Sequence, residues 1–149
     1  MTQNININNE DLIMVQIYEI EAGNFTLAGE AASNIKKLLK QLGIDAKIVR
    51  RVAIAAYEAE INMVIHSVGG TMKLEITPKE IVLKANDDGP GIEDVELAMQ
   101  EGYSTATELA RELGFGAGMG LPNIKRCSDK LHLQSQLGQG TYLEARFFL

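Results

Sequence analysis

Two short blocks of the sequence carry residues whose chemistry suits a polar cleft for a flat ring. Glu58 and Asn62 are four residues apart in a long helical pattern, so a carboxylate and an amide project from one helix face. Asp87 lies at the end of a strand pattern and is followed by Gly89 and Gly91, which let the backbone turn sharply and a ring approach closely. The Asp87 carboxylate can there accept a hydrogen bond from an exocyclic amine.

Two further blocks are rich in glycine. One alternates glycine with other residues directly before a predicted helix, at Gly114, Gly116, Gly118 and Gly120. Such a segment can fold over phosphates, and the free amide groups of the helix start can receive their oxygens. The other block, Gly138 to Thr141, precedes the last predicted strand. No Gly-Lys pair and no Gly-x-Gly-x-x-Gly window occurs in the chain, which excludes the P-loop and dinucleotide-binding classes.

In this order and at these separations, the four blocks resemble the GHKL ATPase superfamily of gyrase, the heat-shock chaperone ATPase, histidine kinases and the mismatch-repair ATPase. The resemblance covers most of the chain. Within the superfamily, the short length is combined with Asp-Asp-Gly-Pro-Gly-Ile, then Gly-Tyr-Ser-Thr, then Gly-Met-Gly-Leu-Pro-Asn-Ile-Lys-Arg. This combination is similar to the anti-sigma-factor serine/threonine protein kinases, including the switch kinases of bacterial stress modules.

The resemblance implies a role for each block in binding ATP and magnesium. Glu58 would be the general base that accepts a hydroxyl proton, and Asn62 would coordinate the magnesium ion. Asp87 would select adenine, with Gly89 and Gly91 shaping its cleft, and the glycines from 114 to 120 would close over the phosphates. Thr141 would support the same adenine through its hydroxyl, although an ordinary strand threonine is the competing interpretation.

The resemblance also implies a partner. Its kinases phosphorylate a serine or threonine of a STAS-type anti-anti-sigma protein, and some members bind a sigma factor directly. A different class of function stays open, an adenine-nucleotide-binding anti-sigma module that sequesters its partner with little catalysis. The catalytic half of a histidine kinase is disfavoured, because the first predicted strand leaves no room ahead of it for a dimerisation helix pair.

The elements that must position these residues follow from hydrophobic periodicity. Strands are expected at 12–21, 71–77, 80–85, 131–136 and 142–148, and helices at 24–42, capped by Asn24 and stopped by Gly43, at 46–67, capped by Asp45, and at 122–129. Residues 93–120 are expected to form a nucleotide lid with two short helices. Strands and helices are segregated, which predicts an α+β fold. We expect a two-layer sandwich, with a mixed, mainly antiparallel sheet covered by helices on one face, as in the Bergerat-type ATP-binding fold of the resembled superfamily.

Composition restricts the function classes further. A chain of 149 residues that is 46% hydrophobic suits a single domain spanning residues 1–149. Its net charge of -6 argues against binding to nucleic acid or an anionic membrane surface. No apolar run has membrane-spanning length and the N-terminus has no secretion-signal pattern, so a cytoplasmic location is expected. The apolar first strand, if it forms a sheet edge, would allow two copies to pair as a homodimer.

Overall fold

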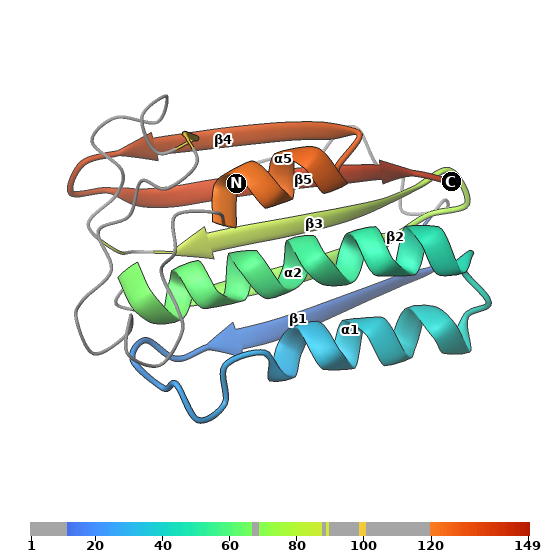
Figure 1. Cartoon of the computed structure of the whole chain (residues 1–149), viewed down its shortest axis with the longest axis horizontal. Helices are drawn as coiled ribbons and strands as arrows, with labels where there is room; N and C mark the ends of the chain where they lie inside the picture. The colour runs from blue at the N-terminus through green and yellow to red at the C-terminus, as the bar shows by residue number, and fades with distance from the viewer. Residues whose placement is uncertain (1–11, 67–68, 88, 90–98, 101–119) are drawn as a thin grey trace.

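The computed structural model describes residues 12–66, 69–87, 89, 99–100 and 120–149, which form two layers (Figure 1). Within these residues one sheet has the strand order β1-β2-β3-β5-β4, and all four pairings are antiparallel. The strands are β1 Met14–Ile20, β2 Gly70–Ile76, β3 Glu80–Asp87, β4 Lys130–Gln136 and β5 Gly140–Phe148. The helices α1 Glu30–Gln41, α2 Ala46–His66 and α5 Gly120–Cys127 cover one face of this sheet, with α2 between the other two. The predicted α+β fold is thus confirmed.

The core lies between the helices and the covered face of the sheet. Strand side chains alternate between the two faces, and one alternating set is almost completely buried: Met72, Leu74, Ile76, Ile81, Leu83, Leu143, Ala145 and Phe147. The helices contribute Ile35, Leu39, Val49, Val52, Ala56 and Ile124 to the same cluster. The covered face therefore carries the odd-numbered residues of both β3 and β5.

The first helix begins later than its periodicity predicts. Asn24 accepts a hydrogen bond from the Leu27 amide at 3.4 Å in a turn ahead of the helix, so it does not cap α1. The helix starts at Glu30, after Gly29, whose positive φ of 95° breaks any continuation from the preceding turn. Leu27 is consequently 52% exposed rather than part of the apolar stripe.

The second helix follows the prediction closely. Gly43 adopts a positive φ of 75°, as expected for the residue that ends α1. The Asp45 carboxylate accepts a hydrogen bond from the Lys47 amide at 2.9 Å, which caps the first turn of α2. This helix runs to His66 and carries both Glu58 and Asn62.

The remaining boundaries differ by a few residues. β3 continues to Asp87 rather than ending at Ala85, and α5 spans Gly120–Cys127 rather than 122–129. The sheet ladder extends β3, because Asn86 and Asp87 still pair with both neighbouring strands. Most of the predicted lid lies outside the described residues, and so do one of its expected short helices and all but the last two residues of the other.

β1 lies at the edge of the described sheet, as the homodimer expectation requires. Its residues Val15 and Ile17, and Ile13 just before it, are exposed on the face without helices, and pairing through this strand stays a prediction. No helix in the described part of the chain is long and apolar enough to cross a membrane.

Candidate functional site

The start of α5 packs directly on the polar face of α2. A Cβ atom placed on Gly120 would lie 3.1 Å from Asn62 Oδ1, 3.2 Å from Asn62 Nδ2 and 3.2 Å from Glu58 Oε2. These distances are shorter than ordinary van der Waals contact, so any larger residue here would require its neighbours to move by a few tenths of an ångström. Gly120 therefore lies beside the carboxylate and amide that the sequence predicted to share a cleft.

Burial and one hydrogen bond set the basicity of Glu58. Burial raises the pKa of this carboxyl group, and a side-chain hydrogen bond from Asn123 acts in the opposite direction. The Asn123 side-chain oxygen in turn accepts a hydrogen bond from Arg126. Because that oxygen is oriented toward Arg126, the amide nitrogen is the Asn123 group that can donate to Glu58. The site thus contains a partly buried carboxylate with a fixed donor.

Arg51 attaches the other end of α5 to α2. Its Nε atom donates to the carbonyl of Cys127 at 2.8 Å, and its guanidinium pairs with Asp129 at 3.0 Å. The guanidinium also lies 5.9 Å from the centre of the Phe147 ring, within cation–π range. This clamp holds α5 in the position where Gly120 and Asn123 meet Glu58.

A second cluster lies across the ends of the strands. The sheet register aligns Gly70 with Asp87, Asp87 with Thr141, and Thr141 with Ser135, in one row across β2, β3, β5 and β4. Asp87 and Thr141 are odd-numbered residues and so lie on the helix-covered face, like Leu83 and Leu143. The Gly89 amide donates to Asp87 Oδ1 at 2.9 Å, which orients the carboxylate.

Met63 links the two clusters. A Cβ atom on Gly70 would overlap the Met63 methyl group and would lie 3.0 Å from the Asp87 Cβ atom. Since Met63 directly follows Asn62 on α2, the carboxylate of the sheet row and the polar face of the helix occupy the same end of the molecule. Figure 1 shows the end of α2 and the arrowheads of β3 and β4 on its left side.

The predicted site is therefore assembled in part within the described residues. Glu58, Asn62 and Gly120 meet at α2, whereas Asp87 and Thr141 belong to the row and Gly89 donates to Asp87. The other predicted site residues, Gly91, Gly114, Gly116 and Gly118, lie outside the described residues. Sequence reasoning assigned no role to Asn123, Ser135, Gly70 or Arg51. Asn123 had a detectable signal, because it is three residues after Gly120 and so shares its helix face.

A metal ion in this site would need ligands from a bound molecule. In the part of the chain that the structure covers, no group of three or more His, Cys, Asp or Glu is placed to hold a metal ion. The side-chain oxygens of Asn62 and Glu58 next to Gly120 are hard donors of the kind magnesium prefers. This donor set fits a magnesium ion that keeps phosphate and water ligands.

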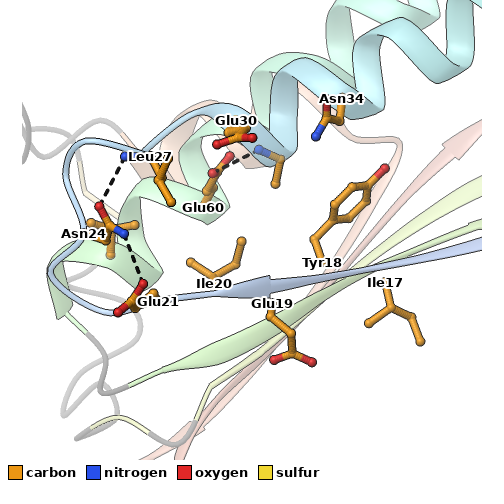
Figure 2. Close-up of a pocket in the computed structure, with 12 residues that line it drawn as sticks. Ile17, Tyr18, Glu19, Ile20, Glu21, Asn24, Leu27, Glu30, Asn34 and Glu60 are labelled. Carbon is orange, nitrogen blue, oxygen red and sulfur yellow. Dashed lines mark hydrogen bonds between the residues drawn. The ribbon is translucent and has the colours of Figure 1, made fainter.

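A cavity of about 390 Å³ lies elsewhere, between β1 and the start of α1 (Figure 2). Glu60 lines it, but Glu58, Asn62, Asp87 and Thr141 do not. Glu60 is 3% exposed, and its carboxylate accepts hydrogen bonds from the backbone amides of Ala31 at 3.2 Å and Ala32 at 2.9 Å. Glu60 therefore serves the start of α1, where it supplies the cap that Gly29 cannot.

Comparison with known sequences identifies the family of this chain. A family model described as histidine kinase-like ATPase domain matches residues 24–147. The chain is 31% identical to the serine/threonine-protein kinase RsbT of Bacillus subtilis over 114 residues, which cover 74% of this chain and 80% of that protein. It is 31% identical to an anti-sigma F factor of Clostridium kluyveri over 118 residues, which cover 76% and 80%.

The fold has a counterpart among solved structures. A chain in the crystal structure of the SiaB-SiaC complex from Pseudomonas aeruginosa matches with a TM-score of 0.60 and 15% identity, over 92% of this chain and 90% of that one. At this level of identity the likeness supports the fold alone.

Proposed function

The chain belongs to the histidine kinase-like ATPase family, and on that premise we propose that it is an ATP-dependent serine/threonine protein kinase. Its substrate is a STAS-type anti-anti-sigma protein, and the pair regulates a sigma factor by partner switching. The observation that carries this proposal is Glu58, a partly buried carboxylate that lies beside Asn62 and Gly120 and receives a hydrogen bond from Asn123. The similarity to a protein named as a serine/threonine kinase supports the same reaction.

The reaction is an in-line phosphoryl transfer. The acceptor hydroxyl oxygen forms a bond to the γ-phosphorus, the bond from that phosphorus to the bridging oxygen of ADP breaks, and the hydroxyl proton passes to Glu58. Burial increases the affinity of this carboxylate for the proton. Phosphoryl transfer depends mainly on positioning and charge neutralisation, so a short set of residues is sufficient.

The other residues bind and orient ATP. The Asp87 carboxylate, oriented by the Gly89 amide, accepts a hydrogen bond from the amine of adenine. Thr141 lies next to Asp87 in the row. The amides at the start of α5 receive the phosphate oxygens. Magnesium, when bound with ATP, neutralises phosphate charge, and Asn62 is the side chain that would hold it.

The test uses ATP radiolabelled at the γ-phosphate, magnesium, the full chain and a purified STAS-type protein from the same organism. We expect label on a serine or threonine of that protein. Glu58→Gln keeps the size of the side chain and should reduce labelling by about a hundredfold or more, with ATP affinity within about threefold of wild type. A variant that labels the partner at the wild-type rate would exclude Glu58 as the base.

The anti-sigma relatives favour a second candidate function, an ATP-dependent binding module that sequesters its partner. It predicts that wild type never labels the STAS-type protein and binds a partner more tightly when ATP is present. The same assay, combined with a pull-down of purified partners with and without ATP, separates the two functions.

A further inference from the structure

Ser135 is the β4 member of the row that also contains Thr141 and Asp87. It is the register partner of Thr141, which is itself the partner of Asp87, so the three side chains lie on adjacent strands β4, β5 and β3. The numbers of all three residues are odd, and the neighbouring odd-numbered residues Leu133, Leu143 and Ala85 pack in or against the core. Ser135, Thr141 and Asp87 therefore share the helix-covered face at one end of the sheet.

The hydrogen bonds of Ser135 determine where the Thr141 proton goes. Ser135 Oγ lies 3.1 Å from the carbonyl oxygen of Gly140 and 2.8 Å from Thr141 Oγ1. A carbonyl oxygen has no proton, so Ser135 donates its single hydroxyl proton to Gly140. Both contacts are hydrogen bonds at the same time only if Thr141 is the donor and Ser135 the acceptor in the short contact between the two hydroxyls. The Thr141 oxygen consequently presents lone pairs, rather than a proton, to anything beside it.

We propose that Ser135 is a positioning residue that sets base specificity: it holds the Thr141 hydroxyl as an acceptor, so that adenine is preferred to guanine. This inference rests on the proposed ATP site. The Asp87 carboxylate is also an acceptor, so the row offers two acceptors side by side. Adenine presents an amine donor to such a pair, whereas guanine carries a carbonyl oxygen at the equivalent ring position, where lone pairs would face lone pairs.

The backbone turn makes this arrangement rigid. Gly140 is buried and has a positive φ of 89°, and the Gln139 amide donates to the Gln136 carbonyl at 2.9 Å in the turn between β4 and β5. The carbonyl that takes the Ser135 proton is thus held by the hairpin itself. Without Ser135, the Thr141 hydroxyl can rotate and donate to a carbonyl of the base, which reduces the penalty against guanine to the part that comes from the Asp87 carboxylate.

The test is a double-mutant cycle on the full chain, with calorimetric affinities for magnesium-ATP and magnesium-GTP. Ser135→Ala should lower the ratio of ATP affinity to GTP affinity by about fivefold, the scale of one neutral hydrogen bond. Thr141→Val removes the hydroxyl at nearly constant volume, and Ser135→Ala added to it should change the ratio no further. Ser135→Thr keeps a hydroxyl and should retain the wild-type ratio.

Ser128→Ala is the matched control, because the Ser128 hydroxyl also donates to a carbonyl, that of Ile124 at 2.9 Å, at the far end of α5. It should leave the ratio unchanged. The inference is overturned if Ser135→Ala changes the ratio equally in wild type and in Thr141→Val, or if it does not change the ratio at all. Either result leaves the proposed ATP site standing. Absence of ATP binding by wild type overturns both. If Ser135→Ala melts below the assay temperature, Ser135→Cys, a weak acceptor of similar size, replaces it and should show the same fall in the ratio.

Discussion

Replacing Gly120 by alanine tests whether α5 positions Glu58 for catalysis. The new methyl group would lie 3.1–3.2 Å from Asn62 and Glu58, where ordinary contact begins at 3.4 Å. The helix or the two side chains must therefore move by a few tenths of an ångström. The Arg51 clamp restrains the far end of α5, so the displacement falls on the site.

Two opposing terms keep the effect of Gly120→Ala on stability small. Alanine favours a helix over glycine by up to about 1 kcal/mol, while crowding in a packed interface costs about 1–3 kcal/mol. The overlap is slight, so the crowding term should lie at the low end and the net change within about 1 kcal/mol, or about 2–4 °C in melting temperature. The effect on catalysis has no such compensation: if a misplacement of 1 Å reduces the rate about a hundredfold, a shift near 0.3 Å predicts a loss of about fourfold.

The assay measures the rate of partner labelling at saturating magnesium-ATP beside a thermal melt. We expect Gly120→Ala to lose about fourfold in rate with its melting temperature within a few degrees of wild type. Ser128→Ala, at the other end of α5, should retain the wild-type rate. An unchanged rate in folded Gly120→Ala, or an equal loss in Ser128→Ala, would refute the claim that close approach of α5 positions the base.

Four more substitutions distinguish the remaining roles. Burial raises the pKa of Glu58, so wild type loses the stabilising protonated form of this group as pH rises above the ordinary glutamate range, whereas Glu58→Gln has no such loss. The melting temperature of Glu58→Gln should therefore rise relative to that of wild type between about pH 4 and 8. Melting temperatures that run parallel over this range would contradict this. Asp87→Asn can keep the Gly89 bond yet presents a donor to adenine, so calorimetry should detect no ATP binding by a normally folded variant. Asn62→Ala should weaken ATP binding with magnesium but not with EDTA, and an equal loss in both would make Asn62 structural. Glu60→Ala leaves two α1 amides without an acceptor and should destabilise the fold by about 2–4 kcal/mol in urea titrations, with wild-type stability as the failing result.

Much of the architecture could be predicted from local pattern. The caps at Asp45 and Gly43 and the hairpin of β2 and β3 all agree with expectation. These features depend on hydrogen bonds and periodicities within a few residues, which a sequence displays directly. The predicted start of α1 was wrong because its cap is not local. Asn24 has a good capping side chain, but the first amides of the helix donate to Glu60, about thirty residues away.

The candidate site divides in the same way. The sequence by itself determined that Glu58 and Asn62 share a helix face and that Asp87 lies at the far end of a strand pattern, because helix and strand periods are local properties. Only the tertiary structure decided that Gly120 lies against both α2 side chains, that Asn123 reaches Glu58, and that Gly70, Asp87, Thr141 and Ser135 form one row. Those contacts depend on strand register and on the distance between helices, which are set by packing among residues far apart in the chain.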